Sequence, residues 1–349
     1  MAWRSYVQKL FQAAAFKKAS TWGTAVQVGA SCGLNFKDIS GIDSTVELNE
    51  IKEVDMTYKS EAYLGVHRLL DISIVTDMLF SPGALGTMIA MVFGTAGVPV
   101  GTGSDKTHTI KIAQAPSLFG TLALGMPGVI WEVPAVVPYS WTLRTAAEGI
   151  MESEIKAYGN RLVAPATVNA DTHMAAITYD DVGNRLLFQN AKFYIKEVPD
   201  TGDTDFVAGD VIDINSFEFT ISRPHEGIIP LGQQSSLQPV QSDVVDVSVN
   251  IGFPKYNSNQ DTLMAAMIGE KKQKAKLEVT GADITSGKPY KLTLYFPLLR
   301  VKPFGAKYED IIKTEVEFLS LKASAAPAGM EQTTPYLVLV NKRATDYLA

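Results

Sequence analysis

Alternation of apolar and polar residues predicts β-strands through much of this chain, most clearly between residues 244 and 296. From Val245 to Ile251 every second residue is apolar, and the residues between them are polar. This period of two is typical of a strand with one face buried and the other in water. Residues 274–280 and 290–296 alternate in the same way around a Ser-Gly-Lys-Pro turn. We therefore expect three strands in this region.

A short helix is expected after the first of these strands, over residues 259–268. Asn257 or Ser258 can cap its first turn, and Gly269 suits its C-terminal end. Three apolar residues at helical spacing give it one narrow stripe: Leu263, Ala266 and Met267. The region therefore has the order strand, helix, strand, turn, strand.

The same order of elements occurs earlier, between residues 71 and 124. The segment Asp71-Ile-Ser-Ile is similar to Asp246-Val-Ser-Val, and residues 82–93 have helical periodicity after a Ser81-Pro82 start. Further strands are expected at residues 53–59, 107–113 and 118–124, and a hairpin at residues 139–145 and 151–158. The recurrence indicates two copies of one module.

The second module contains its own set of expected strands. Residues 191–196 and 217–221 are expected on either side of a polar hairpin tip at residues 200–205, and residues 298–302 and 311–321 as a closing hairpin. The expected strand at residues 312–319 corresponds to the one at residues 151–158. A last strand at residues 336–340 is predicted to be free to pair with a neighbouring molecule.

These patterns predict a mainly β protein with few helices: two tandem β-sandwich or half-barrel modules, each with one flanking α-helix. The predicted divisions are an N-terminal arm at 1–37, a first module at 38–165, a linker at 166–185, a second module at 186–322 and a C-terminal arm at 323–349.

The N-terminal arm is basic and has no Asp or Glu. Helical spacing of Val7, Leu10, Phe11 and Ala14 predicts a short amphipathic helix. Such a helix either covers its own domain or docks on a more acidic neighbouring subunit, and a basic transit peptide is a third interpretation.

Pairs of carboxylates recur on the polar faces of three expected strands: Glu53 and Asp55, Glu152 and Glu154, and Glu315 and Glu317. The plain interpretation is the solvent side of an antiparallel sheet. The alternative is that sheets from several subunits join edge to edge into a wide barrel, so that these side chains face its water-filled lumen.

Length and composition narrow the picture further. A chain of 349 residues, 46% hydrophobic and 19% charged, fits two folded domains. The net charge of −6 and the pI near 5.4 disfavour tight binding to nucleic-acid phosphates. Cys32 is the only cysteine, which excludes an intrachain disulfide and a thiolate zinc site and fits a reducing compartment.

No membrane association is expected. The two most apolar runs, residues 84–100 and 120–139, are interrupted by glycines or prolines. Neither gives the roughly 20 uninterrupted apolar residues of a transmembrane helix.

No catalytic, cofactor or metal site is predicted. The four histidines are far apart, and Gly101-Thr-Gly-Ser lacks the lysine of a phosphate-binding loop. Asp200-Thr-Gly is similar to the aspartic-protease triplet, but its acidic surroundings favour a turn. The spacing of Asp200, Asp203 and Asp205 does not match an EF-hand calcium loop.

Taken in order, these segments resemble the tail tube proteins (major tail proteins) of long-tailed, siphovirus-type phages, in their duplicated-domain form. The matching stretches are Thr21-Trp-Gly-Thr-Ala25, Thr107-His-Thr-Ile110, Asn215-Ser-Phe-Glu-Phe-Thr-Ile-Ser-Arg-Pro224, the run from Asp246 to Lys276, and Thr314-Glu-Val-Glu-Phe318. The similarity covers about residues 20–322, and the apolar, proline-rich segment 120–139 departs from it.

The resemblance implies a structural virion protein of the phage tail, assembled in the host cytoplasm, and not an enzyme. Homotrimeric rings with pseudo-sixfold symmetry would stack into a hollow helical tube through which the genome is ejected. The implied partners are other copies of the chain, the tape-measure protein and transiting double-stranded DNA in the lumen, and tail terminator and baseplate proteins at the ends.

Two other classes stay open from the sequence. One is another tube or ring component of a tail or injection machine, such as a tail terminator, a baseplate protein or a contractile-tube homologue. The other is a carbohydrate-binding or enzymatic β-sandwich, which predicts a concave cluster of exposed aromatic rings or paired acids.

Overall fold

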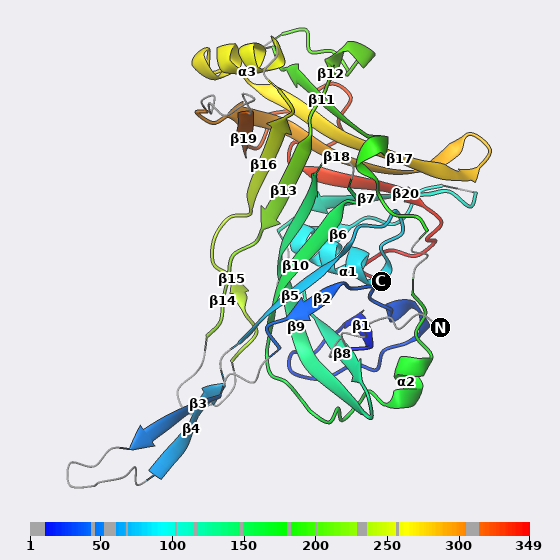
Figure 1. The fold of residues 1–349 in the computed structure, drawn as a ribbon, viewed down its shortest axis with the longest axis vertical. Helices are drawn as coiled ribbons and strands as arrows, with labels where there is room; N and C mark the ends of the chain where they lie inside the picture. Colours follow the sequence, from blue (N-terminus) through cyan, green and yellow to red (C-terminus); the bar gives the residue numbers. More distant parts are fainter. Residues whose placement is uncertain are drawn as a thin grey trace, which may run out of the picture.

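The computed structural model describes residues 11–42, 46–51, 61–67, 69–101, 103–114, 118–146, 149–179, 183–199, 201–228, 236–255, 258–304 and 314–349. The protein is mainly β and elongated, as the sequence predicts for its fold class (Figure 1). Helix α3 (Ser258–Ile268) lies at one end of the molecule. The hairpin of β3 (Val46–Ile51) and β4 (Glu61–His67) projects from the other end.

One antiparallel sheet of 16 strands dominates the described residues. In the first half of the chain its six principal strands are β1 (Ala13–Lys18), β2 (Asp38–Ser40), β5 (Leu70–Asp77), β8 (Gly120–Met126), β9 (Val129–Ala146) and β10 (Glu152–Gly159). In the second half they are β11 (Ala191–Glu197), β13 (Ser216–Ser222), β16 (Asp246–Phe253), β17 (Gln273–Thr285), β18 (Lys288–Val301) and β19 (Thr314–Ser320).

The two halves repeat one order of strand pairing. In the first half the order across the sheet is β1, β8, β9, β10, β5, β2. In the second half it is β11, β17, β18, β19, β16, β13. Helix α1 (Gly83–Phe93) follows β5 along the chain, and α3 follows β16. In chain order, β5 and β16 are the third strands of the two sets, so each half has its helix after its third strand.

The halves are joined in two places. Strand β13 of the second half pairs with β9 of the first, which makes the sheet continuous. Strand β20 (Tyr336–Asn341) lies between β18 and β7 (Lys106–Ile112), and β7 also pairs with β6 (Gly94–Ala96). The prediction that the last strand is free to pair with a neighbour is therefore wrong. The period-two pattern identified a strand but carried no information about its partners.

Helix α1 is buried on all sides, and every residue from Gly83 to Phe93 is buried. It begins after Pro82, so the Ser81-Pro82 start is where the sequence placed it, but no side chain caps its first turn. Gly94 ends it in the left-handed conformation (φ 103°), which glycine adopts without steric cost. A Cβ at Gly86 would lie 2.2 Å from the Tyr347 ring, so this glycine allows close packing.

Helix α3 is different, because only Gln260, Leu263 and Ala266 of it are buried. It therefore flanks the sheet, as predicted, whereas α1 is a core element rather than a flanking one. The composition of α1 explains the difference, since its residues are apolar or small on every face.

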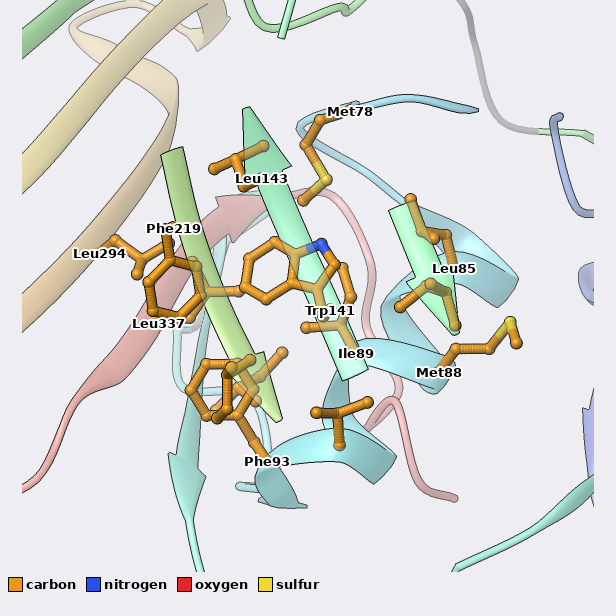
Figure 2. Packing of buried hydrophobic residues seen from close by; sticks show 14 of the residues in the cluster. Met78, Leu85, Met88, Ile89, Phe93, Trp141, Leu143, Phe219, Leu294 and Leu337 are labelled. Atoms are coloured by element: carbon orange, nitrogen blue, oxygen red, sulfur yellow. The ribbon is translucent and has the colours of Figure 1, made fainter. Parts of the chain in front are cut away.

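The core spans both halves. Trp141 of β9 lies at its centre, between Ile89 and Phe93 of α1 and Phe219 of β13 (Figure 2). The Trp141 Nε1–H donates to Ser153 Oγ at 2.9 Å, which satisfies its buried polar atom. Leu294 of β18 and Leu337 of β20 belong to the same cluster.

Arg223, just after β13, also ties the halves together. Its buried guanidinium donates to the carbonyls of Val92 and Phe93 at the end of α1, at 3.0 and 2.7 Å, and to the Ala113 carbonyl at 2.9 Å. A cation at this position satisfies carbonyls that the helix leaves unpaired.

The N-terminal arm packs on its own chain within the described residues. Strand β1 pairs with β8, and Phe11, Ala14 and Phe16 join the main core. The predicted helix is wrong at Ala14, which lies in a strand, while residues 1–10 lie outside the described residues. Pairing with the apolar strand β8 favours extended chain over the helix that the spacing suggested.

The apolar segment 120–139 forms β8 and the first half of β9. Pro134 and Pro138 are tolerated within β9 because the strand ladders shift register beside them, next to Gly120 and Ala157. The hairpin predicted around residues 146–149 is confirmed, since β9 and β10 pair directly.

The predicted linker is folded back onto the first half. It contains the short helix α2 (Asp171–Ala175). Just before the linker, Val163 forms a β-bridge with Glu132 of β9. Glu132 is completely buried and accepts hydrogen bonds from the backbone N–H groups of Thr167, Val168 and Asn169 at 2.8–3.2 Å. The Thr167 hydroxyl and the Asn169 side chain also donate to it.

The polar segment at residues 200–205 is not the tip of a hairpin between the two strands predicted on either side of it, but belongs to the connection between β11 and β12 (Val211–Ile212). Strands β11 and β13 do not pair; β11 instead pairs with β17 and with β12. Asp203 turns inward onto the buried Lys274 Nζ, at 2.9 and 3.0 Å from its two oxygens. The remaining described elements are the small pair β14 (His225–Glu226) and β15 (Val240–Gln241) and three 3₁₀ turns, Ala30–Cys32, Phe188–Asn190 and Ala208–Asp210.

Candidate functional site

A single polar face of the large sheet brings together the carboxylates that the sequence singled out and the structure describes. Glu152 and Glu154 lie on β10, and Glu315 and Glu317 lie on β19. The strands between them carry polar residues on the same face, and their ladders place these residues side by side.

Two rows of directly opposite residues cross six strands in the order β5, β10, β9, β13, β16, β19. The first row is Asp77, Glu152, Arg144, Glu218, Asn250 and Glu317. The second row is Val75, Glu154, Thr142, Thr220, Ser248 and Leu319. We call the surface formed by these two rows the polar sheet face, and we include in it Glu315 and Asp246, which lie on the same side two residues along β19 and β16 from Glu317 and Ser248.

The residues that alternate with this face point into the core. Ile155 of β10, Trp141 of β9 and Phe219 of β13 are all inaccessible to solvent. The period of two therefore fixes which side chains are wet, because a shift of one residue would bury the carboxylates and expose the aromatic rings.

On the first-half side of the face, the carboxylates have cationic partners. Arg144 lies 3.0 Å from Glu152 and 3.7 Å from Glu154. Lys37 lies 2.5 Å from Asp77, and this hydrogen bond raises the pKa of Lys37. These groups are partly exposed, so each pair contributes little to stability and mainly sets the local charge.

On the second-half side, the balance is more acidic. Glu218, Asp246 and Glu315 are exposed, and no described Lys or Arg forms an ion pair with them. Glu317, the fourth carboxylate on this side, forms an ion pair with Lys302. The polar sheet face as a whole is thus hydrophilic and mildly anionic.

A shallow hollow of about 410 Å³ lies where the two halves meet on this face. Its lining includes Arg144 and Glu152 from the first half, and Glu218, Asn250 and Glu315 from the second. Among these described residues there is no cysteine, serine–histidine pair or buried acid pair, so the hollow offers polar contacts rather than a nucleophile.

The register relates the two predicted glutamate pairs to one another. Glu154 lies opposite Val75, four residues after Asp71, and Glu317 lies opposite Asn250, four residues after Asp246. The expected alignment of residues 151–158 with 312–319 would match Glu154 to Glu315 instead, so it is wrong by two residues. The error leaves the face unchanged, since it equals one full period of a strand.

Two of the six predicted residues cannot be placed. Glu53 and Asp55 lie outside the described residues. The sequence reasoning also missed Glu218 and Arg144, which occupy the centre of the polar sheet face. Glu218 belongs to an alternating strand and could have been found by that pattern, but its position opposite Arg144 depends on long-range pairing.

No other cluster of chemical interest emerges from the part of the chain that the structure describes. No group of three or more His, Cys, Asp or Glu side chains there could hold a metal ion. His108 is buried against the Arg343 carbonyl at 2.9 Å, and burial lowers its pKa. Burial also lowers the pKa of His225.

The acidic segment at residues 200–205 does not form a cation site in the described residues. Asp203 is engaged by Lys274, and Asp205 accepts a hydrogen bond from the Phe206 N–H at 2.6 Å. Asp200 lies outside the described residues. In the described part of the chain, no helix is long and apolar enough to cross a membrane.

Comparison with family models and with curated proteins gives no relative to guide the assignment. No protein-family model matches the chain, and no curated protein matches it.

Proposed function

We propose that this protein is the structural subunit of a phage tail tube, which assembles into trimeric rings stacked around a channel for DNA. Each chain would supply two copies of one β module. The polar sheet face would line the channel, with Glu152, Glu154, Glu315 and Glu317 toward the lumen.

The observation that carries the proposal is the continuity of the polar sheet face across two halves that share one pairing order. A face repeated within one chain is suited to a wall repeated between chains. A hydrophilic, mildly anionic wall would repel DNA phosphates and would avoid tight binding that stalls transit. The resemblance of the sequence motifs to tail tube proteins supports the same assignment.

Electron microscopy of the purified full-length chain over a range of protein and salt concentrations tests this proposal. We expect rings with threefold symmetry and an open centre that stack into tubes of indefinite length. Single rings that never stack would instead favour a tail terminator. Monomers under every condition, including in the presence of tail initiator proteins, would contradict the assignment.

A further inference from the structure

The junction between the two halves shows how one module joins the next. Strand β13 pairs with β9 over seven residue pairs, from Ser216 opposite Ala146 to Ser222 opposite Ser140. We call this junction the inner seam. Strand β10 pairs with one edge of β9. Strands β8 and β13 pair with successive parts of the opposite edge of β9.

The equivalent of β13 in the first half is β2, and one of its edges is open. Asp38, Ile39 and Ser40 face Val75, Ile74 and Ser73, just as Glu218, Phe219 and Thr220 face Asn250, Val249 and Ser248. Among the described strands, β2 pairs only with β5, whereas β13 pairs with both β16 and β9.

The equivalent of β9 in the second half is β18. The C-terminal end of β18 has no described strand paired to it on the edge that β17 occupies further back. The ladder between β17 and β18 ends at Gln273 opposite Leu299, and β19 occupies the other edge of β18. No described strand pairs with residues 300–304 on the edge that β17 leaves. The Lys302 N–H donates to the Glu317 carbonyl at 2.9 Å, which keeps this segment extended beside β19.

We propose that β2 of one copy of this chain pairs antiparallel with residues 302–304 of the next copy, in the register of the inner seam. Thr142 is opposite Glu154 and Thr220 at the inner seam, and Lys302 is opposite Glu317 in the second half. Ser40 corresponds to Thr220. Ser40 of one copy therefore lies opposite Lys302 of the next, in what we call the outer seam.

Charge favours this pairing over pairing of like edges. Asp38 is exposed on the β2 edge, while Arg300 and Lys302 near the other edge are partly exposed and each lies beside one carboxylate of its own chain, Glu270 and Glu317 respectively. In the proposed register Asp38 lies diagonally across from Lys302, a separation that long side chains can span. Two β2 edges would instead bring exposed Asp38 carboxylates together.

The outer seam is expected to be weaker than the inner one. Strand β2 has three residues, and Pro303 has no N–H to donate to it. The contact joins two different edges, so it is heterologous and propagates from copy to copy until the ring closes. This inference rests on the proposed function, since it identifies the surfaces through which the ring forms.

Disulfide trapping tests the outer seam. The variant carries Ser40→Cys at an exposed position and Lys302→Cys at a partly exposed one, and retains the buried Cys32. Opposite residues on antiparallel strands lie about 4.5–5.5 Å apart at Cα, which is within the range that disulfides bridge. After mild oxidation, we expect covalent dimers and trimers on a non-reducing gel, with positions 40 and 302 linked by peptide mapping.

Three controls make the result specific. Thr142→Cys with Thr220→Cys should form a bond within one chain and leave its mass unchanged, because these hydroxyl oxygens are 3.0 Å apart at the inner seam. Ser40→Cys alone and Lys302→Cys alone should remain uncrosslinked. Covalent dimers from either single variant would indicate pairing of like edges and would overturn the outer seam.

Electron microscopy of the same samples separates the two proposals. Rings or tubes that form without a link between positions 40 and 302 would overturn the outer seam and leave the tube function standing. A sample that stays monomeric and uncrosslinked at every concentration would overturn both.

Discussion

Glu132 shows how much of this fold depends on single buried polar groups. Its carboxylate lies within an apolar strand and accepts hydrogen bonds from three consecutive residues, Thr167 to Asn169. Burial raises the pKa of Glu132, but the hydrogen bonds from Thr167 and Asn169 outweigh it, so the pKa lies below its ordinary value. The residue acts as a clamp that holds the segment after β10 against β9.

Glu132→Gln should therefore weaken the fold in a pH-dependent way. At pH 7 we expect a loss of about 1–3 kcal/mol, because the amide accepts fewer of these hydrogen bonds. A depressed carboxyl pKa stabilises the native state above the unfolded pKa of about 4.3, and this contribution disappears as the pH falls through the folded value. Urea unfolding from pH 7 to pH 3 measures it. If the free energy of unfolding fell equally with pH in the variant and the wild type, the role of the ionised Glu132 carboxylate would be contradicted.

Lys274 presents the opposite case, a buried cation. Its side chain is inaccessible and donates to both oxygens of Asp203 and to the carbonyls of Thr204 and Ala328. Burial raises the pKa of Asp203, but the hydrogen bond from Lys274 outweighs it and holds that pKa below its ordinary value.

Lys274→Met should cost about 3–5 kcal/mol at neutral pH, because it leaves the Asp203 carboxylate without its cation. The cost should shrink at acid pH, as Asp203 becomes protonated in the variant. Lys288→Met is the matched control: Lys288 pairs with Asp105 at 2.9 Å on the surface, and its removal should leave the unfolding midpoint almost unchanged. Equal effects of the two substitutions would show that burial does not decide the outcome.

At the scale of elements, the sequence predicted what its periodicity encodes. Helices at residues 82–93 and 259–268 and strands such as β16 and β10 lie where the patterns placed them. The patterns failed where an element depends on its partner. Ala14 lies in a strand because β8 lies beside it, and the acidic segment near Asp203 folds inward because Lys274 is there.

The same limit applies to the polar sheet face. Alternation placed Glu152, Glu154, Glu315 and Glu317 on the solvent-facing sides of their strands, because the period of two can be read from the residues of each strand alone. The rows that bring Arg144 opposite Glu218 depend on pairing between residues far apart in the chain, which no local pattern contains.

Strand β20 offers a test of how far one element joins the halves. Val338 lies opposite Thr293 of β18 and Thr109 of β7, so the strand has neighbours on both edges. Val338→Pro removes a ladder N–H in the middle of the sheet and should destabilise the protein by about 3 kcal/mol or more. Val338→Thr keeps the N–H and the branched side chain, and should cost much less. Both are measured by thermal and urea unfolding.

A proline that leaves unfolding unchanged would contradict the pairing of β20. Loss of cooperativity, with two separate transitions in the proline variant alone, would show that β20 couples the two halves during unfolding.

At the scale of the whole molecule, the charge of the polar sheet face is the property to test. Glu218→Lys with Glu315→Lys reverses two exposed carboxylates that pair with no described Lys or Arg. If the face lines a DNA channel, tubes should still form, but the new cations should bind phosphates and slow genome ejection. Ejection kinetics of particles carrying the variant measure this effect, which should weaken at high salt.

Asp171→Lys with Glu331→Lys is the control, because it makes the same change of charge at exposed positions outside this face. Normal ejection by both variants would place Glu218 and Glu315 away from the lumen. Slow ejection by both would point to total charge rather than to the face.

Strand β7, which pairs with β20, has no counterpart among the described strands in the second half of the chain. Between α1 and β8 the first half inserts β6 and β7, while only residues 269–272 separate α3 from β17 in the second. In an assembled cylinder, the exterior would therefore be corrugated, with raised and plain sectors alternating around the circumference. If the chain forms the proposed rings, such relief would mark rotational positions around each ring, so that a protein bound to the outside could distinguish neighbouring sectors that the channel presents as nearly equal.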